Sequence, residues 1–572
     1  MTVRNSEIAG MFEQLADLLE ILEENPFRVR AYRNAARVIR DHPRPMSDLV
    51  RRGNDLSELP GIGKDLAAKV GIILRTGKLP LLEKMRARVP APLVEMTRIE
   101  GLGPKRAKKL YSALKIRSLE DLQRAARSGR IREIEGFGPK TEQLIAQRAA
   151  LAASAERRIG LAEAERIADP LVRFLRKISV VKTVQVAGSF RRRRETVGDL
   201  DILVSASRGA TVMKALVAYE DVDEVISKGT TRATVRLRCG LQVDVRVVRP
   251  ASFGAALYYF TGSKAHNIAV RRLAIAKGLK LNEYGIFRGS RRIGGSDEQD
   301  VFDAVGLPYM PPELRENRGE IEAATRKQLP ALIEIEHMRG DLHCHTRATD
   351  GRDTLEAMAR AAAARGYEYI SINDHSRHVT VAHGLDTRRL QQQIRAIDRL
   401  NDTLRGLVVL KSVEVDILDD GSLDLPDRVL KQLDFTVCAI HYGFRRSRAK
   451  QTERILRAMD HPCFTILAHP TGRLINAREP YDIDLERIME AARERGRILE
   501  LNAQPDRLDL DDRACRMARD AGVRVAISTD AHSVADLDLM RFGIGQARRG
   551  WLEPRDVINT RPLRELRQLF RP

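Results

Sequence analysis

The segment Ala187-Gly-Ser-Phe-Arg-Arg-Arg-Arg-Glu-Thr-Val-Gly-Asp-Leu-Asp201 places a Gly-Ser turn, four consecutive arginines and two alternating acids next to one another. The apolar runs at its two ends, residues 184–187 and 199–204, are typical of β-strands. Because side chains alternate along a strand, Asp199 and Asp201 project from the same face. Two carboxylates on one rigid face, beside a turn that can hold a phosphate, supply the oxygen ligands that Mg²⁺ prefers. The segment therefore predicts a divalent-cation site.

A third acid on a neighbouring strand would complete this site. Asp244 lies in residues 241–247, where apolar and polar residues alternate as in a strand. The alternative is that Asp199 and Asp201 are solvated acids at a strand end. The Gly-Ser turn, the arginines and the later acid favour the metal site.

The length and charge of the chain bound its architecture and its partners. A chain of 572 residues is too long for one core, so about three to four domains are expected. The formal net charge is +21, which favours a polyanionic partner. Residues 1–338 carry 60 Lys and Arg against 42 Asp and Glu, whereas residues 339–572 carry 39 against 36. The partner-binding part is therefore expected in the first half.

The cysteines and the apolar runs bear on the compartment. Five scattered cysteines without a Cys-x-x-Cys pair indicate neither a disulfide framework nor a thiolate zinc site, which fits a reducing cytoplasm. We find no signal-peptide core and no apolar run of spanning length. The expectation is a cytoplasmic, nucleoid-associated chain without a membrane partner.

Residues 1–150 carry helical periodicity and a repeated turn in which two glycines flank an apolar residue. Glycines allow a close backbone approach, and the free N–H groups of the following helix can face a phosphate oxygen. Such contacts hold a nucleic-acid backbone without reading sequence. One such turn alone is more often only a turn, but three with trailing lysines favour binding to a nucleic-acid backbone. The residues concerned are Gly61, Gly63, Lys64, Gly101, Gly103, Lys105, Gly136, Gly138 and Lys140.

A second motif, Tyr258-Tyr-Phe-Thr-Gly-Ser-Lys-Ala-His-Asn-Ile-Ala-Val-Arg271, follows Asp244. It places ring faces, an amide and cations near the expected metal. The alternative is a buried aromatic pair at the start of a helix.

From residue 339 the pattern changes to seven short apolar runs that alternate with helices, as in a parallel barrel. Imidazoles and carboxylates fall at the C-terminal ends of these runs, where barrel active sites lie. Each histidine alone is more often structural, but the repeated placement predicts a cluster of two or three Zn²⁺, Mn²⁺ or Fe ions that activates water against a phosphate ester. His378, His383 and His461 lie off these ends and are expected in loops or at the surface. The predicted ligands are His343, His345, Asp350, His375, Glu414, His441, His469, Asp530 and His532.

These motifs resemble the bacterial and archaeal family X DNA polymerases that carry a C-terminal polymerase-and-histidinol-phosphatase (PHP) domain. The resemblance covers essentially the whole chain. It implies an all-α helix-hairpin-helix region, an α+β nucleotidyltransferase palm with a small thumb, and a distorted (β/α)7 barrel. The implied ranges are an N-terminal domain at 1–90, a fingers-like domain at 91–155, the palm at 156–255, the thumb at 256–317, a linker at 318–338 and the PHP domain at 339–572.

The resemblance implies a polymerase that fills short gaps in base excision repair and end processing. Asp199, Asp201 and Asp244 would bind two Mg²⁺ or Mn²⁺ ions, and Arg271 would contact the template strand of gapped or primer-template DNA. The expected contacts with the incoming dNTP are Gly188, Ser189, Arg192, Gly198, Tyr259, Phe260, Gly262, Lys264 and Asn267. A monomer is expected.

In the PHP domain the family pattern assigns His343, His345, Glu414 and Asp530 to one metal. Glu414, His441 and His469 would hold a second, and Asp350, His375 and His532 a third. The complete set implies an active 3′–5′ exonuclease or 3′-phosphatase.

Lys69 matches the Schiff-base lysine of the family's 5′-deoxyribose-phosphate lyase, and Tyr32 also matches. However, Asp65 and Leu81 stand where the lyase has phosphate-holding lysines, so this activity stays open. Two further alternatives are a PHP nuclease whose polymerase half only tethers DNA, and a DNA-end-binding scaffold without activity.

Overall fold

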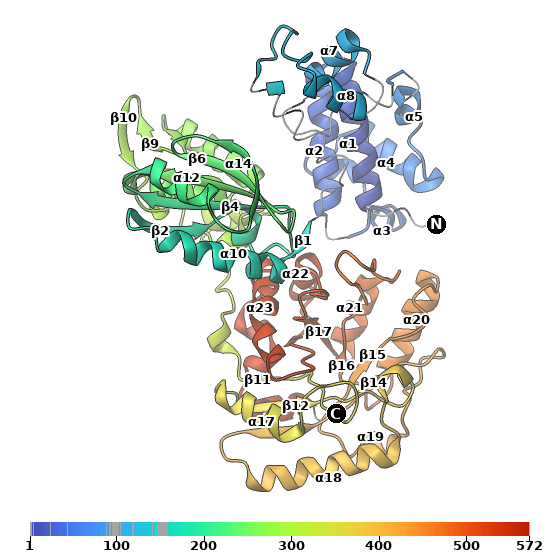
Figure 1. Ribbon diagram of the computed structural model, residues 1–572. Helices are drawn as coiled ribbons and strands as arrows, with labels where there is room; N and C mark the ends of the chain where they lie inside the picture. The colour runs from blue at the N-terminus through green and yellow to red at the C-terminus, as the bar shows by residue number, and fades with distance from the viewer. Residues whose placement is uncertain are drawn as a thin grey trace. The chain divides into compact units, whose positions relative to one another are not determined.

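The computed structural model describes residues 3–570 except 4, 23, 43, 87, 91–92, 94–95, 97–101, 103, 117–118, 140, 143–144 and 146–157 (Figure 1). The chain divides into two compact units, Met1–Arg157 and Arg158–Pro572. No helix in the described part is both long and apolar enough to cross a bilayer.

Every regular element among the described residues of the first unit is a helix. Apolar residues of α1 three and four positions apart pack against α2, with the Phe12 and Tyr32 rings edge to face at 5.5 Å. Asn25 caps α2 by accepting a hydrogen bond from the Phe27 N–H group at 2.9 Å. The helices are α1 Asn5–Ile21, α2 Pro26–Asp41, α3 Met46–Arg51, α4 Lys64–Thr76, α5 Pro80–Arg86, α7 Pro104–Leu114 and α8 Leu119–Arg127.

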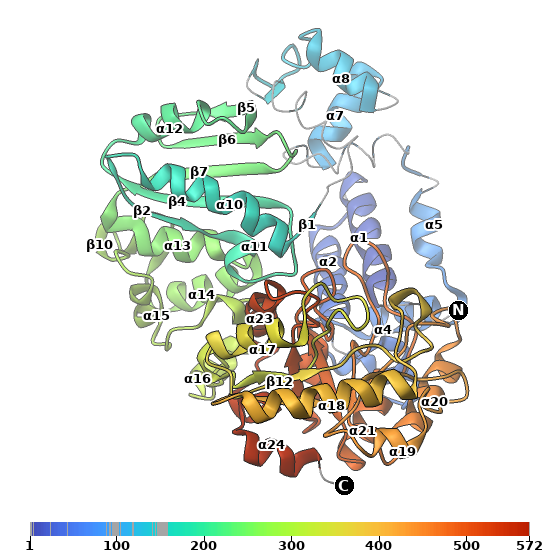
Figure 2. The ribbon, with the colours of Figure 1, turned by 60° about the horizontal axis from the view of Figure 1, so that its bottom comes forward.

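A mixed five-stranded sheet opens the second unit, in the order β2-β4-β7-β6-β5 (Figure 2). Strands β4 and β7 are parallel, and their register sets Asp201 opposite Asp244. Helices α10 and α12 cover the sheet, and Leu508 and Phe542 from the C-terminal region join its apolar core. The elements are α10 Leu161–Arg176, β2 Val181–Val186, α11 Gly188–Arg191, β4 Asp199–Ala206, α12 Gly209–Val217, β5 Val222–Lys228, β6 Arg232–Leu237 and β7 Gln242–Val248.

A smaller helical layer follows, with a three-stranded antiparallel sheet β8-β9-β10. Tyr258 and Phe302 form the centre of its core. Beside them the buried carboxylate of Glu298 accepts hydrogen bonds from Arg191 at 2.8 Å and Arg315 at 2.6 Å. The elements are α13 Phe253–Thr261, α14 Lys264–Ala276, β8 Lys280–Asn282, β9 Gly285–Arg288, β10 Arg291–Gly294, α15 Gln299–Val305 and α16 Glu320–Thr325.

The C-terminal region contains two parallel sheets, β11-β12-β13 and β14-β15-β16-β17-β18. Isolated parallel bridges pair Cys344, which follows β11, with Ala531, which follows β18, and pair His375, which follows β12, with Glu414 of β14. Residues 408–415, one of the seven apolar runs and therefore expected as one strand, form two strands, β13 and β14. The strands are β11 Gly340–Asp341, β12 Tyr369–Ile372, β13 Val408–Lys411, β14 Glu414–Asp416, β15 Val437–Ala439, β16 Ile466–Leu467, β17 Ile498–Asn502 and β18 Val525–Ser528.

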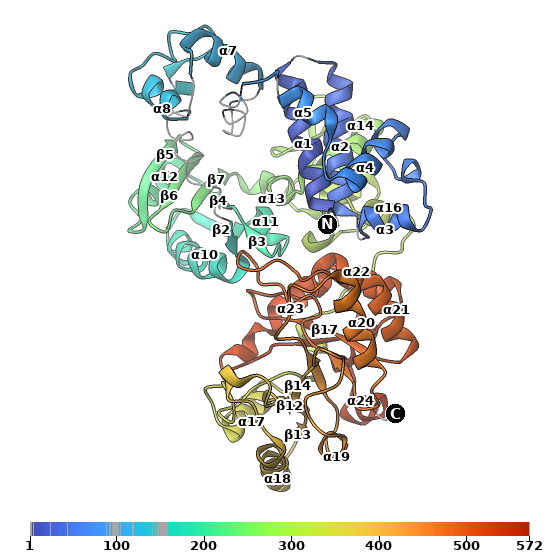
Figure 3. The ribbon, with the colours of Figure 1, turned by 90° about the vertical axis from the view of Figure 1, so that its right-hand side faces the viewer.

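Helices alternate with these strands, and Figure 3 shows α20 to α23 beside the strands of the second sheet. The strands are buried on both faces, as parallel strands require. The helices are α17 Leu355–Ala364, α18 Thr387–Thr403, α19 Asp427–Leu430, α20 Arg448–Met459, α21 Leu485–Glu494, α22 Asp512–Asp520, α23 Met540–Arg549 and α24 Leu563–Phe570.

Candidate active sites

Three acids lie next to one another at the edge where β4 and β7 begin. The carboxylate of Asp244 accepts hydrogen bonds from Thr234 Oγ1 at 2.6 Å and Gln242 Nε2 at 2.8 Å, so its orientation is fixed. Burial raises the pKa of Asp201 to about 7, and the nearby charges of Asp199 and Asp244 add to this effect. A divalent cation would relieve this repulsion, so the acids fit such a group.

The three acids are neighbours, but their possible ligand atoms do not all lie within 4.8 Å of one another. Among the described residues, the groups whose possible ligand atoms all lie within 4.8 Å of one another belong to the C-terminal region.

The Gly-Ser turn faces the same acids. Gly188 has φ +61°, and a Cβ atom there would lie 2.5 Å from Asp201 Oδ2. Only glycine meets both constraints at no cost. The Ala187 N–H group donates to the Asp201 carbonyl at 2.7 Å, which fixes the turn against β4. The turn that could hold a phosphate is thus in contact with an acid that could hold a metal.

The four arginines are engaged rather than solvated. Arg191 pairs with Glu298, and Arg193 pairs with Glu165 of α10. Arg192 donates from Nε to Glu316 at 3.1 Å and from Nη1 to the Thr261 carbonyl. The Arg192 side chain is 13% exposed, so the contact with Glu316 orients it before any ligand binds.

The aromatic motif lies at the junction of α13 and α14. Asn267 Nδ2 donates to the Tyr259 carbonyl at 2.7 Å, and the Arg271 guanidinium lies 5.8 Å from the Tyr259 ring centroid. Arg246 of β7 lies 4.4 Å from the Phe260 ring centroid, which ties this motif to the strand of Asp244. Gly262 is buried, and Gly198 and Lys264 are exposed.

Helix α23 of the C-terminal region packs against the arginine run. Arg549, whose side chain is 2% exposed, donates to the Arg192 carbonyl at 2.7 Å, to Glu316 at 3.0 Å and to Asp512 at 2.6 Å. Burial alone would raise the pKa of Glu316, but Arg549 and Arg192 lower it to about 2. Glu316 thus bridges Arg192 and Arg549 of the C-terminal region.

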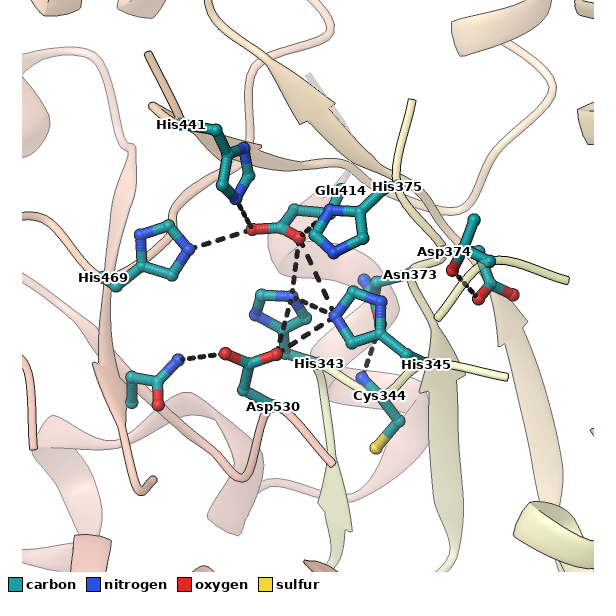
Figure 4. Close-up of polar contacts among 12 residues, drawn as sticks. His343, Cys344, His345, Asn373, Asp374, His375, Glu414, His441, His469 and Asp530 are labelled. Carbon is teal, nitrogen blue, oxygen red and sulfur yellow. Dashed lines mark hydrogen bonds and ion pairs between the residues drawn. The ribbon is translucent and has the colours of Figure 1, made fainter. Parts of the chain in front are cut away.

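The nine predicted metal ligands meet in one cluster at the strand ends of the C-terminal region, and Figure 4 labels all of them except Asp350 and His532. The structure forms three groups: His343, His345 and Asp530; His345, Asp350, His375 and His532; and His375, Glu414 and His441. His469 joins through Nε2, 3.0 Å from Glu414 Oε1.

Two acids that the sequence reasoning missed orient the cluster. Glu500 lies 2.7 Å from His343 Nδ1 and accepts from the His469 backbone N–H group at 2.7 Å. Asp416 contacts His441 Nδ1 at 3.1 Å and His378 Nδ1 at 2.9 Å. A carboxylate on Nδ1 leaves Nε2 to face a metal. The signal that could have identified them was their place near the ends of strands. Glu500 lies two residues before Asn502, the last residue of β17, and Asp416 lies two residues after Glu414 and is the last residue of β14.

The electrostatics of the cluster fit a cation. Burial and then the neighbouring imidazoles of His532 and His375 lower the pKa of His345 to about 4. The Nε2 atoms of His343 and His345 lie 3.2 Å apart. Burial would raise the pKa of Glu414, but His375, His441 and His343 hold it well below its usual value. Several lone pairs therefore face one small buried space, as in a transition-metal site.

The glycine turns of the first unit are described in part. Gly61 has φ +91° and a Cβ atom there would meet Asn34 Nδ2 at 2.2 Å, while Gly63 caps the N-terminus of α4. Lys64 and Lys105 are exposed at the first and second positions of α4 and α7, and Gly136 has φ +88°. Gly138 follows the buried Phe137. Gly101, Gly103 and Lys140 lie outside the described residues.

Lys69 lies over the Tyr32 ring, 6.0 Å from its centroid. Its ammonium pairs with Asp65, and the side chain is 15% exposed. Asp65, which stands where the resemblance would place a phosphate-holding lysine, is therefore the partner of Lys69.

Four family models match successive parts of the chain. A helix-hairpin-helix domain matches residues 3–79 and a SAM-like helix-hairpin-helix tandem matches residues 93–150. The DNA polymerase beta palm matches residues 158–242 and the DNA polymerase beta thumb residues 256–316.

Three relatives extend this match. The chain is 29% identical over 208 residues, 34% of its length, to a probable phosphatase of Caldanaerobacter subterraneus subsp. tengcongensis, of which 77% is covered. It is 28% identical over 231 residues, 38% of its length, to a probable phosphatase of Thermoanaerobacter pseudethanolicus, of which 89% is covered. It is 36% identical over 569 residues to the DNA polymerase/3′-5′ exonuclease PolX of Bacillus subtilis, with 99% of both chains covered. This chain therefore belongs to the family X DNA polymerases of the PolX type.

Proposed function

We propose that this chain fills short gaps in DNA as a DNA-directed DNA polymerase and trims or cleans 3′ ends through a metal-dependent PHP nuclease. The observation that carries the first activity is the register of β4 and β7, which sets Asp201 beside Asp244 with Gly188 against the Asp201 carboxylate.

Asp199, Asp201 and Asp244 would hold two Mg²⁺ or Mn²⁺ ions, which when bound activate the primer 3′ hydroxyl and neutralise the triphosphate. Thr234 and Gln242 keep the Asp244 carboxylate oriented for this role.

The neighbouring residues would position the nucleotide. Gly188 and Ser189 offer backbone N–H groups at the first turn of α11, and Arg192 would pair with phosphate oxygens from the position that Glu316 holds. Tyr259 and Phe260 would line the sugar and base, and Asn267 would face the base edge. Gly198, Gly262 and Lys264 complete the proposed contacts.

We assign residues 339–572 to a PHP domain with a distorted (β/α)7 barrel. The isolated bridges that pair segments following the strands of one sheet with residues of or after the strands of the other support this fold. The nine clustered ligands would hold up to three Zn²⁺, Mn²⁺ or Fe ions, which when bound supply a nucleophilic water. The arrangement of His345, Asp350, His375 and His532 in one group supports this assignment.

We propose the remaining domain boundaries on the same resemblance. Residues 1–90 and 91–155 would be helical DNA-binding domains, 156–255 the palm, 256–317 the thumb and 318–338 the linker. Gly61, Gly63, Lys64, Gly101, Gly103, Lys105, Gly136, Gly138 and Lys140 would contact the DNA backbone, and Arg271 the template. Lys69 remains a candidate for a lyase, although its ion pair with Asp65 does not favour it.

The test is incubation with a 5′-phosphorylated duplex that carries a one-nucleotide gap, with and without dNTPs, in Mg²⁺ and then in Mn²⁺. Asp201→Ala should abolish extension and keep 3′ trimming. Extension that survives in this variant refutes the palm assignment. Trimming without extension in the wild type would favour the alternative in which the polymerase half only tethers DNA.

A further inference from the structure

A pocket of about 180 Å³ opens beside His441 and His469 of the PHP cluster. It is smaller than the roughly 300–1,000 Å³ that holds a drug-sized ligand, so it suits one small unit of a substrate. Besides these two metal ligands, its lining consists of a cationic wall and an apolar wall.

One wall is cationic. Arg478 donates from Nε to the Gly472 carbonyl at 2.8 Å, and its guanidinium lies 4.3 Å from the Phe444 ring centroid, so the cation is held in place. Arg507 also lines the pocket, and its Nε atom lies 3.9 Å from the Asp530 carboxylate. Two guanidinium groups in one small pocket repel each other, and an anion between them would relieve that repulsion.

The other wall is apolar and open. Val381, at the tip of the short turn Thr380–Ala382, is 85% exposed, and Tyr442 is 37% exposed. The Tyr442 ring lies 4.9 Å from the ring of His378, which Asp416 holds. A rigid ring face and an exposed aliphatic side chain next to a cation pair fit a ligand with a flat apolar part and a phosphate.

We propose that this pocket binds the 3′-terminal nucleotide of a DNA strand, a deoxynucleoside monophosphate unit. Its phosphate lies between Arg478 and Arg507 toward the histidines, and its base and sugar lie against Tyr442 and Val381. The proposal rests on the nuclease function proposed above and names its substrate subsite.

Binding in this pocket distinguishes two reactions that the metal cluster alone does not distinguish. In nucleotide release, water adds to phosphorus and the bond to the 3′ oxygen of the penultimate nucleotide breaks. That oxygen takes a proton, and a nucleoside 5′-monophosphate leaves. The nucleoside part of this product lies against the apolar wall. In 3′-phosphate removal the released product is inorganic phosphate, which contacts only the cationic wall.

The test compares both reactions in the full chain on one labelled oligonucleotide with a 3′ hydroxyl or a 3′ phosphate end. Tyr442→Ala should lower kcat/KM for nucleotide release at least tenfold, and at least five times more than for phosphate removal. Arg507→Ala should lower both, whereas Arg428→Ala, an exposed arginine of α19, should change neither. Equal losses in both reactions for Tyr442→Ala, or no loss, overturn the proposal.

Two further measurements keep this result separate from failure of the proposed function. His343→Ala must abolish both reactions; if both survive, the metal-cluster assignment itself is wrong. By calorimetry, thymidine 5′-monophosphate should bind wild type with one more site than Tyr442→Ala, because the palm is unchanged between them. Identical titrations of the two proteins overturn the subsite even if the nuclease is active.

Discussion

Replacing Arg549 by alanine tests whether the C-terminal region supports the proposed polymerase site. Arg549 is buried and donates to the Arg192 carbonyl, to Glu316 and to Asp512. Breaking a buried ion pair usually costs about 3–5 kcal/mol, because a buried charge is left without its partner. Here Glu316 keeps Arg192, and Asp512 keeps Arg318 at 2.9 Å. We therefore expect a cost at the lower end, about 3 kcal/mol.

Trp551 is the only tryptophan of the chain, and it lies buried two positions after Arg549, with Arg516 3.9 Å from its ring centroid. Its fluorescence during guanidinium unfolding reports on this junction directly. We expect the unfolding midpoint of Arg549→Ala to fall clearly below that of wild type.

Arg541→Ala is the control, because its ion pair with Glu165 leaves the arginine half exposed and such pairs contribute about 0–1 kcal/mol. Since Glu316 also orients Arg192, Arg549→Ala should raise the KM for dNTP several-fold in primer extension. An unchanged midpoint together with an unchanged KM refutes the coupling.

Three more predictions concern single sites. Gly188→Ala should abolish gap filling without loss of 3′ trimming, because the new Cβ atom would lie 2.5 Å from Asp201 Oδ2; normal extension would contradict the geometry. His343→Ala, or prior chelation of the wild type, should remove 3′ trimming measured on labelled DNA and leave extension in Mg²⁺ intact. Burial would raise the pKa of Glu298, but Arg191 and Arg315 lower it to about 2. Since this folded pKa lies below the ordinary value of 4.5, its ion pairs contribute fully above about pH 4.5, and that contribution is lost as the pH falls toward 2. Thermal unfolding at pH 5 and pH 3 should show a smaller difference for Glu298→Gln than for wild type, and equal differences would refute the assignment.

The local pattern of the chain was enough to predict the elements and their chemical residues. Alternation around Asp199 and Asp201 predicted a strand with both acids on one face, and β4 follows it. Histidines at the ends of apolar runs predicted a cluster, because parallel strands bring their C-terminal ends together. The split of residues 408–415 into β13 and β14 was not predictable, since apolar residues recur on both sides of Ser412.

The sequence by itself determined which residues are candidates for the chemistry, because periodicity and residue type are local properties. Only the tertiary structure decided how these residues are held. The pairing of β4 with β7 put Asp244 opposite Asp201, strand contacts placed Glu500 and Asp416 behind the histidines, and α23 brought Arg549 to Arg192, a residue 357 positions earlier. Such contacts depend on the packing of distant elements, and an isolated arginine or acid in a sequence carries no sign of its distant partner.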